Sequence, residues 1–251
     1  MTLAHARRQK LLELLQAEGG LRTAELAQRL GASEATVRRD LAELERQGRL
    51  KRVHGGALPL QPGPAVEPPY ELKARARVRA KARIALAASR LVRDGATVIL
   101  DSGTTLLALA RILRERRITA LALDLKVADA LARGRAEVWL VGGRVRNGLF
   151  SLVGPWAERG LADVHADAFF MGADAVDGVA VTNATFEEAA VKQAAAAAAA
   201  KTYLLADRSK FGRRALARVL PLEALDGVVG ERGVEAELPE LREKVGFVEL
   251  V

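Results

Sequence analysis

The sequence has no cysteine among its 251 residues and only three histidines, at positions 5, 54 and 165. The lack of cysteine excludes a disulfide framework, a thiol nucleophile and a cysteine metal site. The histidines stand too far apart in the sequence to suggest a zinc cluster. The sequence therefore gives no support for a bound metal or another cofactor.

Long apolar runs are also absent. A transmembrane helix needs about 18 or more apolar residues, and even the alanine-rich segment at 194–200 is bracketed by Lys192 and Lys201. The first apolar run of the chain is interrupted by Glu13, and no small-residue cleavage site follows it, which argues against a secretory signal. These patterns predict a cytoplasmic protein without a membrane span.

Positive charge is concentrated near the N-terminus. Half of the residues are hydrophobic and 28% are charged, which is typical of a folded soluble protein, and the formal net charge is +8. Residues 1–58 carry a net charge of +4, residues 59–100 carry +5, and the remaining 151 residues carry −1. Clustered lysine and arginine gain free energy by releasing counterions from phosphate backbones. This asymmetry predicts a polyanionic partner for the N-terminal part.

A proline-rich segment divides the chain. Pro59 to Pro69 contains five of the eight prolines, and proline fixes φ and lacks a backbone donor, so this segment should be extended and semi-rigid. After it, apolar strand-like runs alternate with helical patterns, which is typical of an α/β domain with a mainly parallel sheet. We therefore expect a small domain at 1–58, a linker at 59–70 and a larger domain at 71–251.

Three helical patterns precede the proline-rich segment. A leucine stripe predicts a first helix from about residue 4 to residue 18. Thr23 can cap a second helix and Ser33 a third, with a glycine break between them. The expected elements are helices at 24–30 and 33–47 and a β-hairpin with a glycine turn at 49–60. This order predicts a helix-turn-helix followed by a hairpin wing.

Basic side chains lie on the predicted third helix and on the wing. Arg38 and Arg39 lie off the apolar stripe of the helix, and the wing carries Lys51, Arg52 and His54. A charge run on a helix is most often only a solvated face. Here it coincides with a helix-turn-helix spacing, in which the second helix enters the major groove and the wing touches the flanking backbone. We therefore favour DNA binding.

The segment SEATVRRDLAELERQGRLKRVHGGA (33–57) resembles the N-terminal motif of the DeoR family of bacterial transcriptional regulators, and the resemblance covers nearly the whole chain. It implies a winged helix-turn-helix and a C-terminal sensor domain related to ribose-5-phosphate isomerase that binds a phosphorylated sugar or a similar metabolite. The residues that would approach DNA are Ser33, Thr36, Arg38, Arg39, Lys51, Arg52 and His54. Asp40 is expected to orient an arginine, because phosphates would repel its charge.

The clearest pattern in the second domain is ATVILDSGTTLLALARIL (96–113), which follows an arginine-rich helical pattern at 71–93. A strand at 97–100 should lead through a polar loop, Asp101 to Thr105, into a helix. Backbone N–H groups, hydroxyls and a helix N-terminus together suit a phosphate. From the residues alone, a simple capped turn is the better interpretation. The family resemblance reverses that preference, because this loop matches the family's phosphate-binding segment.

Other candidates lie after later strands. Gly142 and Gly143 end a predicted strand and permit close approach of a ligand or merely a turn. Lys210 resembles the ligand-site lysine of the family, and its alternative is a surface lysine beside a turn. The expected effector-binding residues are Asp101, Ser102, Gly103, Thr104, Thr105, Asp124, Gly142, Gly143 and Lys210.

Two positions depart from the family pattern. Leu123-Asp124 stands where Thr-Asn is common, and Gly230-Glu231 stands where Thr-Asp is usual. An aspartate at 124 would repel a second phosphate. It would instead bind sugar hydroxyls, or the site has lost its usual ligand.

Three functions follow from these patterns. The leading hypothesis is a non-enzymatic transcriptional regulator, a repressor of a carbohydrate-metabolism operon, which binds an operator as a homodimer or homotetramer and responds to a phosphorylated sugar. The second is an active sugar-phosphate isomerase with an attached DNA-binding domain, in which Asp101 is an acid/base carboxylate beside a phosphate site with Lys210. The third is an architectural protein that binds DNA without sequence preference.

Overall fold

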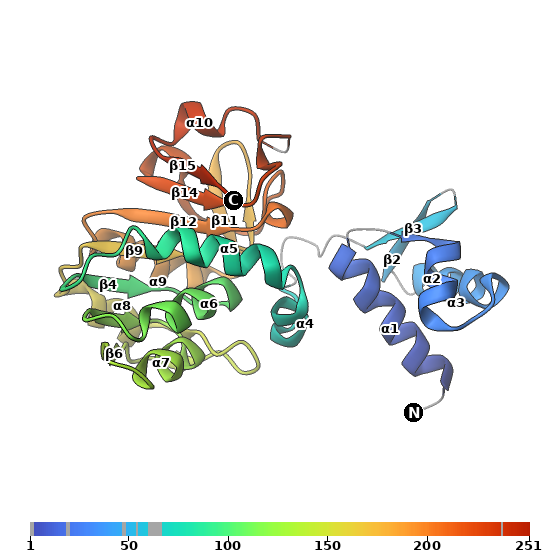
Figure 1. The fold of residues 1–251 in the computed structure, drawn as a ribbon, viewed down its shortest axis with the longest axis horizontal. Helices are drawn as coiled ribbons and strands as arrows, with labels where there is room; N and C mark the ends of the chain where they lie inside the picture. Colours follow the sequence, from blue (N-terminus) through green and yellow to red (C-terminus); the bar gives the residue numbers. More distant parts are fainter. Residues whose placement is uncertain (1–2, 19–20, 47–48, 54, 60–66, 237) are drawn as a thin grey trace. The chain divides into compact units, whose positions relative to one another are not determined.

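The computed structural model describes residues 3–18, 21–46, 49–53, 55–59, 67–236 and 238–251. The chain divides into two compact units, one formed by Met1–Pro62 with Glu71–Ala76 and the other by Gly63–Tyr70 with Arg77–Val251 (Figure 1). His54, most of the predicted linker and the side chain of Lys51 lie outside what the structure describes. No helix among the described residues has the length and apolar composition to cross a membrane.

The first unit has the predicted helix-turn-helix and hairpin. Its elements are α1 (Leu3–Glu18), β1 (Leu21–Arg22), α2 (Thr23–Leu30), α3 (Glu34–Arg46), β2 (Leu50–Val53) and β3 (Gly56–Pro59). Leu15, Leu26 and Leu41 belong to the apolar core that joins the three helices. Gly31 adopts a left-handed conformation at φ 59° and ends α2, as the sequence pattern predicts.

The wing has one more strand than the sequence pattern predicts. β1 pairs with β3, so the hairpin of β2 and β3 becomes a three-stranded antiparallel sheet in the order β1-β3-β2. A Cβ atom at Gly56 would lie 2.4 Å from the carbonyl oxygen of Leu21. Glycine at this position therefore allows β1 to approach the hairpin closely.

The second unit is built on a seven-stranded parallel sheet in the order β15-β14-β12-β9-β4-β5-β6 (Figure 1). The strands are β4 (Thr97–Leu100), β5 (Thr119–Ala122), β6 (Glu137–Leu140), β9 (Ala168–Met171), β12 (Thr202–Ala206), β14 (Gly227–Gly230) and β15 (Val248–Leu250). This is the α/β fold with a mainly parallel sheet that the alternating pattern predicts.

Helices cover both faces of this sheet. One face carries α5 (Val78–Ser89), α6 (Thr104–Leu113) and α7 (Leu125–Ala132); the other carries α8 (Pro155–Ala162), α9 (Phe186–Ala197) and α10 (Leu241–Lys244). Alternate side chains of β4 enter the two apolar cores, with Val98 on the side of α5 and Ile99 on the side of α9. Burial on both faces explains why these strands are nearly continuous apolar runs.

Shorter elements complete the second unit. Two antiparallel strands, β7 (Arg144–Val145) and β8 (Leu152–Val153), form a hairpin, and a second small sheet contains β10 (Ala175–Val176), β11 (Ala180–Asn183) and β13 (Ala217–Pro221). Three 3₁₀ turns follow strands: η1 (Arg208–Lys210), η2 (Leu222–Ala224) and η3 (Val234–Ala236).

The expectation of one helical stretch over 71–93 is wrong. The structure has two helices, α4 (Tyr70–Arg75) and α5, and Arg77 between them has a left-handed backbone at φ 52°. The Arg77 guanidinium lies 2.8 Å from a Glu231 carboxylate oxygen and 3.6 Å from one of Asp207. These long-range ion pairs accompany the break, and no local sequence pattern reveals them.

Candidate functional site

Both arginines of the predicted DNA-reading helix are exposed. Arg38 and Arg39 lie on the solvent side of α3, and Arg38 forms an ion pair of 2.8 Å with Glu34 one turn earlier. The Ser33 hydroxyl accepts a hydrogen bond of 3.3 Å from the Thr36 amide, so Ser33 caps the first turn of α3. The arginines are therefore placed where a double helix can reach them, as DNA binding requires.

A hollow of about 630 Å³ adjoins Arg38. It is lined by Arg22, Arg38 and Arg52, by Glu34, and by the glycine turn of the wing. Arg52 lies on β2 and is exposed, with its guanidinium 3.8 Å from the Glu45 carboxylate. Three guanidinium groups around one concave surface suit a phosphate backbone. Sequence reasoning missed Arg22, because it is a single arginine before α2 and only the third strand of the wing brings it here.

Asp40 orients arginines, as predicted, and the structure identifies them as Arg7 and Arg8 of α1. Their Nε atoms donate hydrogen bonds of 2.6 and 2.8 Å to the two oxygens of the buried Asp40 carboxylate. Burial alone raises the pKa of Asp40, but these charge-assisted hydrogen bonds outweigh it and hold the pKa below its ordinary value. Asp40 thus joins α1 to α3 and does not face DNA.

In the second unit, Asp101 lies buried at the C-terminal end of β4. Its Oδ2 accepts a hydrogen bond of 2.8 Å from the Gly172 amide and a second one from the Lys192 ammonium group. Lys192 also donates to the Gly172 carbonyl oxygen at 3.0 Å. Asp101 therefore joins the loop after β4 to the loop after β9, and its Oδ2 is already occupied by protein donors.

The rest of this loop opens α6. Ser102, Gly103 and Thr104 are partly exposed and Thr105 is buried, with α6 beginning at Thr104. Gly103 has φ 108°, a conformation that favours glycine. The structure therefore places the predicted phosphate segment at a helix N-terminus, with N–H groups in the first turn that no helical carbonyl satisfies.

Lys192 is a site residue that sequence reasoning missed. Its side chain is only 4% exposed. Burial by itself lowers the pKa of Lys192, but the carboxylates of Asp101, Glu188 and Asp174 raise it above its ordinary value. The ammonium group thus stays charged at neutral pH. Its only sequence signal is a lysine within an alanine-rich helix, which is more typical of a solvated face.

Asp124 caps α7. Its Oδ1 accepts hydrogen bonds of 2.7 and 3.0 Å from the Lys126 and Val127 amides, while its Oδ2 is buried without a hydrogen-bond partner among the described residues. Burial raises the pKa of Asp124, more than the hydrogen bonds from backbone amides lower it. The Gly103 amide is among these donors, and the charge of Asp101 adds to the rise, so Asp124 lies beside the loop that follows β4.

The remaining predicted residues, Gly142, Gly143 and Lys210, follow β6 and β12. Gly142 is exposed, and Gly143 has φ 133° with so little space that a Cβ atom would lie 2.9 Å from the Val153 carbonyl oxygen. Gly143 is thus explained by packing against β8. Lys210 ends η1 after β12, at the same edge of the parallel sheet as the loop of Asp101.

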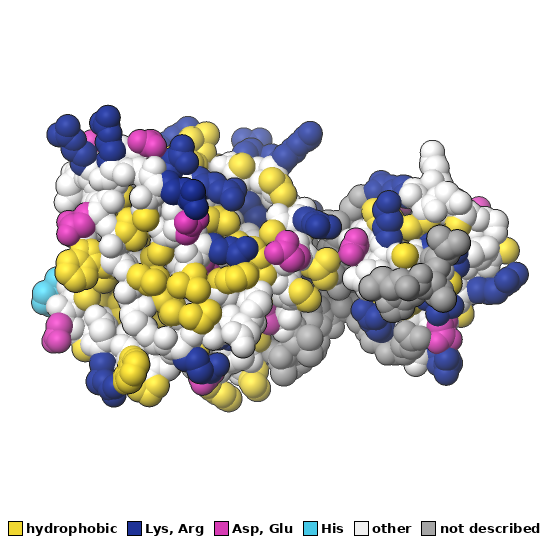
Figure 2. Space-filling view, turned by 90° about the horizontal axis from the view of Figure 1, so that it is seen from below, with side chains coloured by type: hydrophobic (Ala, Val, Ile, Leu, Met, Phe, Trp, Pro, Cys, Tyr) yellow, Lys and Arg dark blue, Asp and Glu magenta, His cyan; other side chains and the backbone are white. Residues whose placement is uncertain are grey.

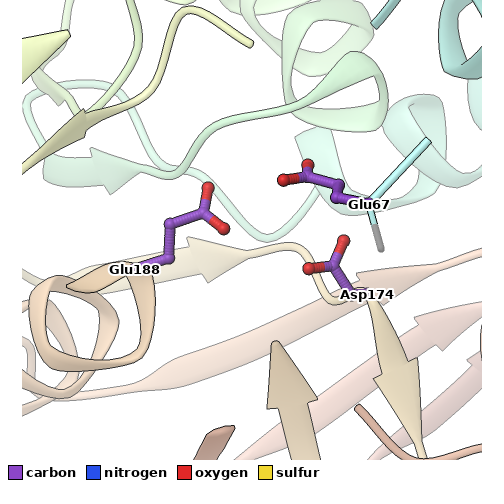
Figure 3. A group of neighbouring side chains, drawn as sticks. All are labelled: Glu67, Asp174 and Glu188. Atoms are coloured by element: carbon purple, nitrogen blue, oxygen red, sulfur yellow. The ribbon is translucent and has the colours of Figure 1, made fainter. Parts of the chain in front are cut away.

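Three carboxylates gather beside Lys192. Glu67, Asp174 and Glu188 come from the segment before α4, the loop after β9 and the first turn of α9, and their oxygen atoms lie within 4.8 Å of one another (Figure 3). The Arg146 guanidinium lies 2.9 Å from Glu67 and 2.6 Å from Glu188. This arginine neutralises a carboxylate pair that would otherwise be costly to bury.

Glu188 has further donors. The Ser151 hydroxyl donates a hydrogen bond of 3.0 Å and the Asn183 amide one of 3.2 Å to its carboxylate. The Asn183 Oδ1 is buried without a hydrogen-bond partner in the described part of the chain. The sequence pattern showed Glu188 only as an acidic residue in the first turn of a helix, and it did not single out Asp174 or Arg146.

Comparisons with known proteins agree with this two-unit organisation. A family model described as the DeoR-like helix-turn-helix domain matches residues 7–62, and one described as the DeoR C terminal sensor domain matches residues 76–232. The HTH-type transcriptional regulator GlpR of Haloferax volcanii is 34% identical over 242 residues, covering 96% of this chain and 94% of that protein. The lactose phosphotransferase system repressor of Staphylococcus aureus is 30% identical over 248 residues, covering 98% and 99%.

Among solved structures, ribose 5-phosphate isomerase A from Methanocaldococcus jannaschii is similar with a TM-score of 0.41 and 17% sequence identity, over 54% of this chain and 55% of that chain. The two family models cover most of the chain, and the relatives align over nearly their whole length. The chain belongs to the DeoR family of transcriptional regulators, with an N-terminal helix-turn-helix domain that binds DNA and a C-terminal sensor domain.

Proposed function

We propose that this protein represses a carbohydrate-metabolism operon and that a phosphorylated sugar bound in the sensor domain controls its affinity for the operator. One relative is named as a repressor of the lactose phosphotransferase system, which supports the carbohydrate assignment. In this proposal residues 1–58 bind DNA, residues 59–70 connect the domains and residues 71–251 bind the effector. The exposed Arg38–Arg39 pair beside the arginine-lined hollow is the observation that carries the DNA-binding part.

At the operator, α3 enters the major groove and the wing follows the flanking backbone. Arg38 and Arg39 contact base edges or phosphates, and Ser33 and Thr36 approach the backbone at the start of the helix. Lys51, Arg52 and His54 belong to the wing contacts. Arg22 joins this set, because it lines the same hollow as Arg38.

In the sensor domain, the phosphate of the effector binds at residues 102–105, where the N-terminus of α6 presents free N–H groups. Lys210 follows η1 at the same sheet edge and supplies positive charge. A sugar hydroxyl donates to the unpartnered Oδ2 of Asp124, which needs a donor and would repel a second anion. Asp101 and Lys192 position the phosphate loop through their mutual ion pair.

The two other hypotheses are weaker. An isomerase needs a free catalytic base, whereas Oδ2 of Asp101 is held by Lys192 and the Gly172 amide, and the relatives are named as regulators and repressors. An architectural DNA binder has no need of a sensor domain, whereas residues 76–232 match the family model of the DeoR C terminal sensor domain.

A homodimer or homotetramer is part of the proposal. Hydrophobic side chains gather on one face of the larger unit in Figure 2, and exposed apolar residues include Trp139 and Leu140 on the edge strand β6. Such surface is typical of interfaces between subunits. Two copies of the DNA-binding unit would engage half-sites about 34 Å apart. Light scattering after size-exclusion chromatography measures the assembly, and a monomer at micromolar concentration would contradict it.

Footprinting of the promoter of its own gene tests the function directly. We expect a protected site that weakens or shifts with one member of a panel of pentose and hexose phosphates. Replacing Arg38 and Arg39 together by alanine should abolish protection, whereas Arg133→Ala should leave it unchanged, because Arg133 is an exposed arginine of the other unit. A site that no sugar phosphate affects would refute control by such an effector.

A further inference from the structure

The last residues of the connection between the units, 67–70, are attached to the β7–β8 hairpin at two points. Glu67 accepts a hydrogen bond of 2.9 Å from Arg146, and both side chains are at most 13% exposed. Three residues further along, the Tyr70 ring lies edge-on against the Phe150 ring at 5.2 Å. The Lys126 ammonium group lies 4.3 and 4.2 Å from the centres of these two rings. An ion pair and an aromatic contact together hold residues 67–70.

The same hairpin is attached to the effector site. Arg146 is shared between Glu67 and Glu188, and Ser151 donates to the same Glu188 oxygen. The Phe150 carbonyl oxygen accepts a hydrogen bond of 3.1 Å from the Leu125 amide, next to the α7 cap. Residues 67–70 and the site that contains Asp124 are therefore connected through contacts of the β7–β8 hairpin.

The three neighbouring carboxylates of Glu67, Asp174 and Glu188 differ in how firmly the fold holds them. Asp174 accepts a backbone hydrogen bond of 2.9 Å from Ala184, and Glu188 is held in α9 with donors from Ser151 and Asn183. Glu67 lies in an irregular segment before α4. Additional negative charge in a buried acidic cluster raises the cost of every carboxylate in it. Glu67 can therefore withdraw without unfolding a strand or a helix, whereas Asp174 directly precedes β10 and is bonded to the Ala184 amide.

We propose that Glu67 is an internal occupant of the effector site, which the anionic effector displaces from Arg146. This rests on the proposed function in naming the effector as a phosphorylated sugar. When the effector enters, Arg146 exchanges the Glu67 carboxylate for an oxygen of the same phosphate that residues 102–105 bind. Residues 67–70 are then released. Because they form the end of the connection to the DNA-binding unit, their release changes the restraint on that unit and so the operator affinity.

Hydrogen exchange in the full-length protein tests the contact without knowledge of the effector. Glu67→Gln should increase amide exchange in peptides covering residues 67–76 by about tenfold, because the glutamine cannot replace a charge-assisted bond to a buried guanidinium. Glu71→Gln is the matched control, since it removes the same charge from an exposed position four residues further on. Inorganic phosphate, added to the wild type as an anionic probe, should increase exchange in the same peptides.

Two outcomes would overturn the proposal. Equal exchange in Glu67→Gln and the wild type would mean that the ion pair does not hold the segment. Unchanged exchange of residues 67–76 of the wild type in saturating phosphate, with slower exchange at residues 102–107 showing that the anion occupies the sensor domain, would mean that Glu67 is not displaced.

Operator binding separates this proposal from the proposed function. The sugar phosphate that alters operator affinity in the wild type should change the operator affinity of Glu67→Gln by no more than about twofold, because residues 67–70 are already released in the variant. A full effect in both proteins refutes the role of Glu67 and leaves the proposed function intact. No effect of any sugar phosphate on the wild type refutes the proposed function, while the exchange measurements still decide about Glu67.

Discussion

Asp124 combines a helix cap with an unpartnered oxygen in one side chain. Its raised pKa means that the ionised form costs stability at neutral pH, a cost that disappears as the pH falls through that pKa. Asparagine caps helices as well as aspartate does and carries no charge. Asp124→Asn should therefore leave the melting temperature unchanged or raise it, whereas Asp124→Ala should destabilise by about 1 kcal/mol through loss of the cap. Calorimetry of both variants checks this, and equal destabilisation would contradict it.

The contribution of Asp40 to stability should depend on pH in the opposite way to that of Asp124. Its folded-state pKa lies below the ordinary value of 3.8, so its contribution to stability is complete above that value and is lost as the pH falls through the lowered pKa. Asp40→Asn should destabilise the helix-turn-helix unit by about 1–3 kcal/mol at pH 7, because Arg7 and Arg8 lose a charged acceptor. Calorimetric melts from pH 7 to about pH 2 should show the variant and the wild type converging only below about pH 4. A constant difference would be evidence against this ion-pair account.

The left-handed backbone of Arg77 between α4 and α5 leads to a prediction about the stability of this helix break. A left-handed backbone costs a residue with a Cβ atom about 1 kcal/mol relative to glycine. Arg77→Gly and Arg77→Ala both lose the ion pairs to Glu231 and Asp207, so the difference between them isolates the backbone. The glycine variant should be the more stable of the two in urea denaturation. Equal midpoints would mean that the two helices have merged across the break.

The charge asymmetry predicts how the whole protein responds to salt. Each phosphate contact contributes about −0.9 to the slope of the logarithm of operator affinity against the logarithm of salt concentration. Arg52→Ala should weaken binding to every sequence about equally and reduce the magnitude of that slope by about 1. Arg133→Ala, outside the DNA-binding unit, should leave the slope unchanged. Fluorescence anisotropy at several salt concentrations measures both, and an unchanged slope for Arg52→Ala would remove Arg52 from the interface.

Much of the fold could be predicted because its signals are local. The leucine stripes of α1 and α3, the glycine at 31 and the apolar run of β4 each specify an element within a few residues of sequence. The site was predictable in part. Asp101 lies in a recognisable loop, but Lys192 is 91 residues further along the chain and joins it only through the packing of α9. A lysine or arginine in a helical pattern carries no local sign that it will be buried.

The sequence by itself determined the helix-turn-helix with its exposed arginines, the alternation of strands and helices in the second unit and the strand, loop and helix at 97–113, since periodicity, caps and turns depend on neighbouring residues. Only the tertiary structure decided that Arg77 separates two helices, that Asp40 binds α1, and that Arg146 joins Glu67 to Glu188. Those features depend on pairs of charges that are distant in sequence. A buried charge needs a partner of opposite charge, and only the folded chain brings the two together.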